Sequence, residues 1–267
     1  SPANRRRYMD MLLSQLYPDY VEALRAYQTA ISWRNALLRH LREEGGDPAQ
    51  LAPLEEVLVR NGVAISLYRR RVIGTLTLHA DRIHRELTGG AAWLQLQYEP
   101  NFDPLCPPAL DYQMGLLSES TQDMPVDVES LQDAYRDALH QRRKREIQRG
   151  ITLLGPHRDE LSFISDGVNL GTFGSRGQQR TVVMALRLAE LRWLSQETGE
   201  SPVLLLDEVL AELDRKRRAY LLDLLCKRSE NAEQTILTTT DVEMFPPDFR
   251  ERTLMLEVKQ GVIAPVS

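Results

Sequence analysis

A short apolar run that ends in two adjacent carboxylates constrains the fold of this chain more than any other feature. Residues 203–206 read Val-Leu-Leu-Leu, and Asp207 and Glu208 follow directly. Such a run is typical of a strand buried on both faces of a parallel sheet. Because open α/β sheets bind ligands at the carboxyl ends of their strands, we predict that Asp207 holds Mg²⁺ and Glu208 takes a proton from an attacking water. The alternative is that the two acids simply end the strand.

The second half of the chain alternates between strand and helix patterns, which predicts an α/β domain with a mostly parallel sheet covered by helices. The expected strands are at 151–154, 161–164, 203–206, 235–239, 253–258 and 262–266, and the expected helices are at 176–197 and 214–228.

The first half has the three-and-four spacing of long amphipathic helices, at about 20–41 and again from about 51 to 88. The break at Gly45–Pro48 predicts that they pack as an antiparallel hairpin or short coiled coil. Five prolines between residues 100 and 125 predict a loop or lid, and a further helix is expected at about 128–149. We therefore expect a helical arm domain over 1–150, with its hairpin at about 19–88, and an α/β domain over 151–267.

Composition limits the classes of protein that fit. The longest apolar run has five residues, far short of the ~20 that span a bilayer, and the two cysteines lack disulfide or zinc spacing. These features favour a cytoplasmic protein without a membrane segment. The net charge of −5 means that DNA binding would need a local basic patch. The candidates, each equally consistent with a solvated helix face, are Arg5, Arg6, Arg7, Arg69, Arg70, Arg71, Arg142, Arg143, Lys144 and Arg145.

A second candidate site is the segment that begins the helix expected at 176–197. Ser175, Arg176, Gly177 and Gln178 stand at its start, where uncovered backbone N–H groups suit a phosphate. A plain N-cap would look similar. His157, in the sequence Gly-Pro-His-Arg-Asp, invites a catalytic interpretation, but a buried structural turn is favoured.

The order and spacing of these motifs resemble a known class of ATPase. Residues 175–179, the pair Asp207–Glu208 and the pair Leu213–Asp214 are similar to the signature motif, Walker B motif and D-loop of ABC-type heads in the SMC-like class. Within that class the chain resembles the RecF family of bacterial recombination mediators over essentially its whole length. The residues that carry this likeness are Ser1–Asp10, Tyr27–Gln28, Arg34–Asn35, Gly155–Asp159, Phe173–Thr181 and Thr238–Asp241.

The resemblance implies ATP and Mg²⁺ as cofactors, with ATP held between two subunits of an ATP-dependent homodimer. It implies that Ser175, Arg176, Gly177 and Gln178 contact the γ-phosphate held by the opposite subunit. It places Asp207 on Mg²⁺, Glu208 on the attacking water, Asp214 at the dimer seam, and Thr240 or Asp241 at the switch position. It further implies binding of duplex DNA and single-strand junctions in DNA repair, recombination, replication and the SOS response. RecR is the implied partner, with RecO and RecA in the same pathway.

One expected motif is absent from the sequence. RecF-like proteins carry a Walker A loop, G-x-x-x-x-G-K-[ST], and no such string occurs here. We therefore expect a fragment of a longer protein, inactive alone, whose intact form is a slow ATPase. An alternative is a nucleotide-incompetent interaction module whose helical arm recruits partners. A third, a metal-dependent nuclease, would need a further cluster of Asp, Glu or His around Asp207 and Glu208 that the sequence does not display.

Overall fold

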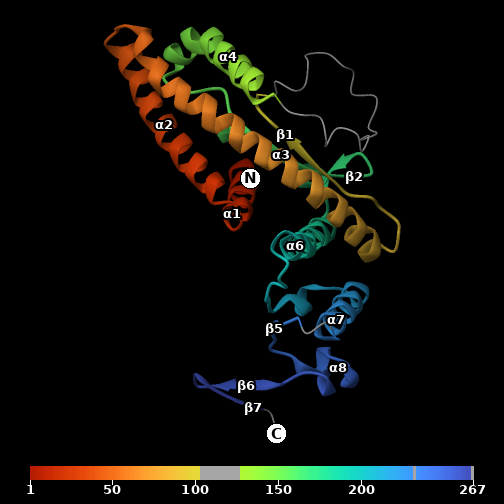
Figure 1. Ribbon diagram of the computed structural model, residues 1–267. Helices are drawn as coiled ribbons and strands as arrows, with labels where there is room; N and C mark the ends of the chain where they lie inside the picture. The colour runs from red at the N-terminus through yellow and green to blue at the C-terminus, as the bar shows by residue number, and fades with distance from the viewer. Residues whose placement is uncertain (103–126, 231–232, 266–267) are drawn as a thin grey trace. The chain divides into compact units, whose positions relative to one another are not determined.

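The computed structural model describes residues 1–102, 127–230 and 233–265, and the chain divides into two compact units (Figure 1). The first unit comprises residues 1–77 and 95–174, and the second comprises 78–94 and 175–267. Residues 151–174 thus pack with the first unit, and the division at residue 150 stays a prediction. Most of the proline-rich stretch predicted as a loop or lid lies outside the described residues.

The two long helices predicted on either side of Gly45–Pro48 are confirmed. Helix α2 spans Pro18–Glu43 and helix α3 spans Ala52–Thr88, with the short helix η1 (Pro48–Leu51) between them. Side chains of α2 at 20, 27 and 34 meet α3 at 69, 62 and 55, respectively. Each contact is seven residues from the next on both helices and the order is reversed, so α2 and this part of α3 run antiparallel with heptad spacing.

Two glycines make room for a pair of buried tyrosines in the first unit. A Cβ at Gly62 of α3 would lie 2.7 Å from the ring of Tyr135, on α4 (Val128–Arg149), and 3.2 Å from the ring of Tyr27. A Cβ at Gly155 would lie 2.1 and 2.3 Å from the two hydroxyls, and its φ of +124° also favours glycine. Gly62, which costs a helix about 1 kcal/mol in isolation, therefore permits close packing of three helices.

The strand predicted at 151–154 is wrong, because side chains of the helices occupy its backbone groups. Asn35 of α2 accepts a hydrogen bond from the amide of Thr152 at 2.7 Å. Glu146 of α4 accepts one from the amide of Leu153 at 2.6 Å. The segment is therefore an anchored loop between α4 and the sheet.

An antiparallel sheet completes the first unit. Strand β1 (Gln95–Glu99) pairs with β2 (Glu160–Ser165), which pairs with β3 (Val168–Asn169). The other elements of this unit are α1 (Pro2–Ser14), η3 (Pro156–Arg158) and α5 (Leu170–Phe173).

The second unit contains the end of α3 and a series of short strands and helices. Strands β4 (Leu204–Asp207) and β5 (Thr235–Thr238) pair in parallel, and β6 (Leu256–Lys259) and β7 (Val262–Pro265) pair antiparallel. Among the described strands this one parallel pair takes the place of the mostly parallel sheet expected from the sequence. Its helices are α6 (Arg176–Thr198), η4 (Val209–Glu212), α7 (Arg215–Glu230), η5 (Val242–Met244) and α8 (Pro247–Glu251).

Only one face of the parallel pair is covered, so the prediction that the strand at 203–206 is buried is wrong. Leu204, Leu206 and Leu237 pack against a leucine-rich cluster, half of whose buried residues belong to α7. Leu205 is 69% exposed and Ile236 is 51% exposed on the other face. Alternate residues of the apolar run at 203–206 therefore differ in exposure, since one face of the strand is packed and the other is not.

No helix in the described parts of the chain is long and apolar enough to cross a membrane.

Candidate functional site

The parallel pairing of β4 and β5 brings the ends of two strands to one edge. Asp207 is opposite Thr238 in the strand register, and both are the last residues of their strands. Glu208 and Thr240 follow within two residues of these ends. The acidic pair therefore meets the threonine-rich segment after β5, as strand order alone requires when parallel strands are neighbours.

The Glu208 carboxylate accepts hydrogen bonds at both of its oxygens from Thr240. The amide of Thr240 donates to Oε2 at 3.0 Å, and its hydroxyl donates to Oε1 at 2.9 Å. Glu208 itself has a φ of +51°, in the left-handed region that non-glycine residues seldom adopt. Its amide donates to the carbonyl of Thr238 at 3.3 Å, which helps to hold this conformation. Strained backbone of this kind often accompanies functional sites.

Asp207 is exposed and bound by a single threonine hydroxyl. Thr238 Oγ1 donates to Asp207 Oδ1 at 2.5 Å, and no hydrogen bond to Oδ2 is present among the described residues. Carboxylate oxygens are the ligands that Mg²⁺ prefers, and Mg²⁺ is commonly held by one or two carboxylates together with substrate phosphates. The donor set at this edge fits that chemistry. Within the described ranges no group of three or more His, Cys, Asp or Glu is arranged to hold a metal ion.

The segment predicted to bind phosphate forms a capping box at the start of α6. Ser175 Oγ accepts from the amide of Gln178 at 3.3 Å, and Gln178 Oε1 accepts from the amide of Ser175 at 2.9 Å. Arg176 and Gly177 lie beside them in the first turn, and all four residues are exposed. The plain N-cap is therefore present, while the first turn of a 23-residue helix stays open to an anion.

Asp214, the D-loop candidate, caps the next helix. Its carboxylate accepts from the amide of Arg217 at 2.9 Å and forms an ion pair with the Arg217 side chain. The backbone hydrogen bond from Arg217 lowers the pKa of Asp214, and the Arg217 charge adds to this effect. Asp241, the other switch candidate, accepts from the amide of Glu243 at the start of η5. Of the two switch candidates, Thr240 is the one hydrogen-bonded to the acidic pair.

Some of the basic residues predicted to bind DNA form ion pairs within the protein, and the others are partly or fully exposed. Arg5 forms a bidentate pair with Glu160 at 2.7 and 2.8 Å, and Arg143 pairs with Glu55. Arg69 is 2% exposed and is bound to Asp10 and Asp159, so it cannot reach a phosphate at the surface. The remaining candidates are partly or fully exposed: Arg6, Arg7, Arg70, Arg71, Arg142, Lys144 and Arg145.

His157 belongs to a largely buried turn and is held as a neutral ring. Tyr27 Oη lies 2.8 Å from Nδ1, and Nε2 lies 3.3 Å from the carbonyl of Thr152. Burial, together with the charges of Arg158 and Arg6, lowers the pKa of His157 to about 4. The neutral tautomer that fits these contacts accepts from Tyr27 and donates to Thr152. These contacts describe the structural turn favoured by the sequence.

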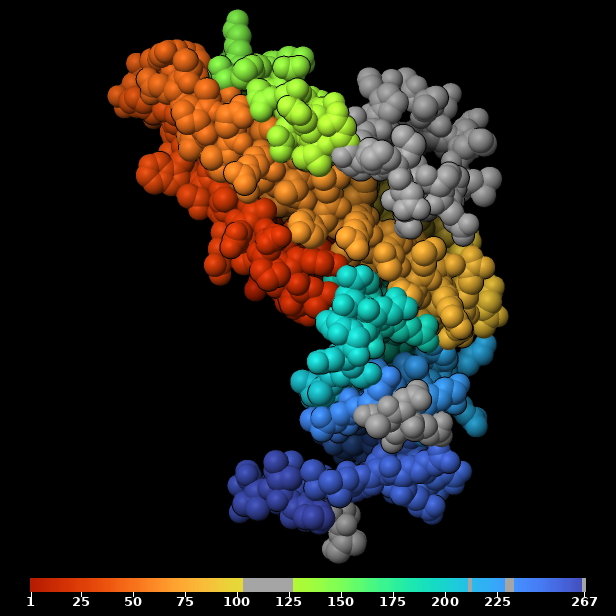
Figure 2. All heavy atoms as spheres, in the orientation of Figure 1, coloured from red at the N-terminus to blue at the C-terminus, as the bar shows by residue number. Residues whose placement is uncertain are grey.

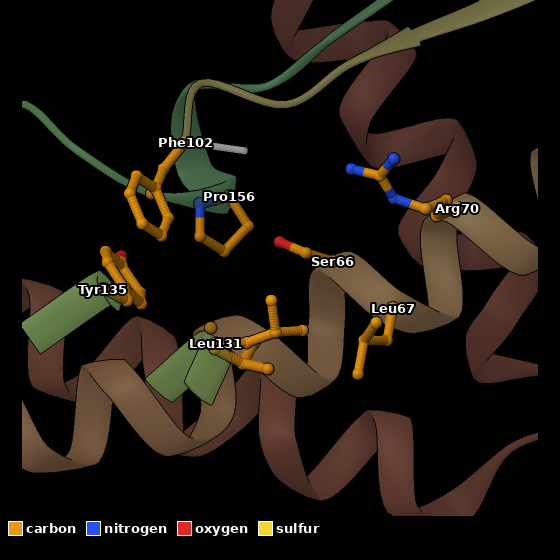
Figure 3. A pocket seen from close by; sticks show the side chains of 10 residues that line it. Ser66, Leu67, Arg70, Phe102, Leu131, Tyr135 and Pro156 are labelled. Atoms are coloured by element: carbon orange, nitrogen blue, oxygen red, sulfur yellow. The ribbon is translucent and has the colours of Figure 1, made fainter. Parts of the chain in front are cut away.

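A small hollow beside this turn is too small for an organic ligand (Figure 3). Its volume is about 20 Å³, and its walls include Leu67, Phe102, Leu131 and Tyr135. A space of this size holds about one water.

The chain is similar in sequence to known proteins. No protein-family model matches it. It is 39% identical over 267 residues to the DNA replication and repair protein RecF of Herpetosiphon aurantiacus, covering 99% of this chain and 62% of the relative. It is 38% identical over 268 residues to RecF of Geobacillus thermodenitrificans, covering 100% of this chain and 66% of the relative. The chain is homologous to RecF.

A solved structure agrees with the sequence relatives. The recombination mediator protein RecF with ATP, described in the RecFOR pathway, matches with a TM-score of 0.78 and 25% identity, over 100% of this chain and 64% of that one. The fold is therefore that of a partial ABC-type ATPase head with a helical arm, as predicted. The chain spans about 62% of the length of the RecF of Herpetosiphon aurantiacus.

Sequence analysis of this RecF homologue missed Thr238 as a member of the acidic edge. The signal was available, because the run Thr238–Asp241 follows a predicted strand, but the pairing partner and register were not known. Once β4 and β5 are adjacent, Thr238 lies opposite Asp207 and its hydroxyl contacts the carboxylate.

Proposed function

We propose that this chain is part of a RecF-like recombination mediator, which is a DNA-binding ATPase that dimerises when it binds ATP. The observation that carries the proposal is the acidic edge, where Asp207 and Glu208 follow β4 and are hydrogen-bonded by Thr238 and Thr240 after β5. The similarity to RecF over nearly the whole chain supports it.

Each site residue has a role in this proposal. Asp207 holds Mg²⁺, which neutralises phosphate charge when it is bound, and Glu208 orients or deprotonates the attacking water. Ser175, Arg176, Gly177 and Gln178 contact the γ-phosphate of ATP held by a second subunit. Asp214 lies at the dimer seam, and Thr240 acts at the switch position.

The hydrogen bonds of Glu208 support slow hydrolysis. Both carboxylate oxygens accept from Thr240, at 2.9 and 3.0 Å. A water that Glu208 is to activate must share or displace one of these hydrogen bonds, which adds a step before proton transfer. ATP binding then favours the dimeric state, and hydrolysis releases it, so that ATP acts as a timing signal.

The cellular role follows from the same family likeness. We propose binding of duplex DNA and single-strand junctions at gaps, in recombinational repair and replication restart. RecR is the proposed partner, and RecA loading with RecO is the proposed outcome, in the cytoplasm and within the SOS response. The exposed members of the basic runs are the candidates for DNA contacts.

The test is Glu208→Gln in the full-length gene product. This change keeps the shape of the side chain and removes the acceptor of the water proton. ATP binding and ATP-dependent dimerisation should persist, while hydrolysis should fall by about 100-fold or more. Turnover of labelled ATP measures the first effect, and light scattering with and without ATP measures the second.

The matched control is Glu251→Gln, the same change at an exposed residue of α8. It should leave hydrolysis unchanged. Equal turnover in the wild type and Glu208→Gln would contradict the Walker B role. Absence of any ATP binding by the wild type would favour the alternative of an interaction module.

A further inference from the structure

A basic groove on the first unit has no role in the proposed ATPase site. Its volume is about 470 Å³, and it lies between α1, α2, α3 and the turn that contains His157. Helix α1 and the start of α2, drawn in red to orange, lie on the surface in Figure 2. The groove is thus formed by four segments, including the Gly155–Asp159 motif that the ATPase function leaves unexplained.

The sign of the groove is set by two arginines of α1. Of the charged side chains that line it, Asp10 and Arg69 pair with each other at 2.7 Å, and Arg69 also binds Asp159. Because these two acids share one arginine, their cluster carries one net negative charge. Arg6 and Arg7 form no ion pair among the described residues and add two positive charges, so the lining and this cluster together carry a net charge of +1. The groove therefore favours an anion.

Arg6 and Arg7 differ from their neighbour Arg5 because successive residues point in different directions around a helix. Arg5 turns to Glu160 and is neutralised by it. Arg6 Nη1 donates to the carbonyl of Asp159 at 2.9 Å, which fixes its head group and leaves its other N–H groups available. Arg7 is exposed and forms no hydrogen bond or ion pair with any other residue in the described ranges.

The remaining polar wall contributes neutral groups. Gln28 of α2 is exposed, and its amide can donate to an anion. Tyr27 and His157 are satisfied by their mutual hydrogen bond at 2.8 Å. They therefore form a fixed neutral floor below the two arginines and add no negative charge.

We propose that this groove binds a phosphate group, with Arg7 as its main ligand and Arg6 and Gln28 beside it. Planar guanidinium groups match phosphate oxygens in geometry and keep their charge at any physiological pH. A DNA backbone and a free polyphosphate present the same chemistry. The choice of DNA as the source rests on the proposed function, whereas the phosphate site itself does not.

The test compares Arg7→Gln with Arg39→Gln in the full chain. Arg39 is exposed on α2, about 16 Å along the helix from Gln28, so both variants lose one surface charge. The probes are a short duplex oligonucleotide, followed by fluorescence anisotropy, and pyrophosphate, followed by calorimetry. Arg7→Gln should weaken binding about tenfold and lower the slope of log K against log salt for the duplex by about 0.9.

Arg39→Gln should change the affinity less than twofold, and Arg7→Lys should recover part of the loss because it restores the charge. Binding of either probe that depends on Arg7 supports the phosphate site, and the duplex arm identifies DNA as its source. Binding that Arg7→Gln and Arg39→Gln weaken equally, or no binding of either probe that depends on Arg7, overturns the site. Failure of ATP hydrolysis to respond to Glu208→Gln would contradict the proposed function and leave this result unaffected.

Discussion

A buried ion-pair cluster in the first unit differs from a more exposed ion pair in the second. In the first unit the side chains of Arg34, Glu55 and Glu146 are 0%, 1% and 0% exposed, and Arg34 bridges the two acids at 2.8 and 2.7 Å. In the second unit Asp214 and Arg217 form a pair whose side chains are 53% and 24% exposed. The first arrangement connects three segments of the fold, and the second caps one helix.

The tyrosine cluster of the first unit and the parallel strands of the second also differ in burial. Tyr20, Tyr27 and Tyr135 are 2% exposed or less, whereas Leu205 is 69% exposed. In the second unit Asp207 is exposed and Glu208 is half-buried. Their carboxylates accept hydrogen bonds from threonines at the point where β4 and β5 end. At these places the first unit uses polar side chains to join segments of the fold, whereas the second leaves the side chains of Asp207 and Asp214 exposed.

The largest expected effect is that of Arg34→Met in the first unit. The substitution keeps most of the side-chain volume and removes the cation that pairs with the buried Glu146, whereas Glu55 keeps its ion pair with Arg143. Breaking a buried pair in this way costs about 3–5 kcal/mol, because uncompensated charge stays in the interior. Urea unfolding followed by circular dichroism should show this loss, and hydrogen exchange should localise it to α2, α3 and α4.

Its counterpart in the second unit is Arg217→Met, which removes a partly exposed cation. The expected cost is less than about 1 kcal/mol, since solvent screens the remaining carboxylate. A similar loss of stability in both variants would remove the distinction between the units.

The next effect is the pH dependence from His157. Burial lowers its pKa from 6.5 in the unfolded chain to about 4 in the folded chain. The unfolded chain therefore binds a proton first as pH falls. The contribution is fully present above pH 6.5 and is lost progressively between about 6.5 and 4, by about 3 kcal/mol in total.

The measurement is the free energy of unfolding of the wild type minus that of His157→Gln across this range, which cancels groups that titrate equally in both proteins. An NMR titration of the imidazole provides the independent check. A midpoint near pH 6.5 in the folded protein would show that burial does not keep the ring neutral.

Sequence patterns predicted the local elements of the second unit better than their packing. The acidic pair, the capping segment and the two parallel strands follow from local residue order, which strand and helix periodicity captures. The exposed face of Leu205 does not follow, because an apolar run does not reveal whether both faces have partners. The buried strand expected at 203–206 was wrong for that reason.

The first unit shows the reverse. Periodicity predicted α2 and α3, yet the segment at 151–154 was wrongly predicted as a strand because side chains far away in sequence satisfy its amides. Arg69 belonged to a basic run, and only the tertiary structure shows it bound to Asp10 and Asp159. Long-range polar contacts of this kind leave no local pattern in the sequence.

The smallest effects are expected when one glycine in each unit is replaced by alanine. In the first unit this substitution is Gly62→Ala. The new methyl would lie 2.7 Å from the ring of Tyr135 and 3.2 Å from that of Tyr27, so buried groups must move. The gain in helix propensity is about 1 kcal/mol, and overpacking typically costs about 1–3 kcal/mol. A net loss of stability in urea unfolding is expected, and a gain would show that the three helices are not closely packed at this point.

Gly177→Ala, in the first turn of α6, should have the opposite sign. The nearest atom to its new Cβ would be Ser175 Oγ at 4.0 Å, and all the surroundings are exposed. Replacing glycine at a compatible helical position stabilises by about 0.4–1 kcal/mol, since the unfolded chain loses freedom. The same methyl lies where the proposed γ-phosphate contact would form, so ATP-dependent dimerisation of the full-length gene product should weaken while stability rises. Gain of stability with unchanged dimerisation would mean that this helix start is only a cap. The first turn of α6 would then have only a structural role. Asp207 and Glu208 would remain as the candidate functional residues that distinguish the second unit from the first.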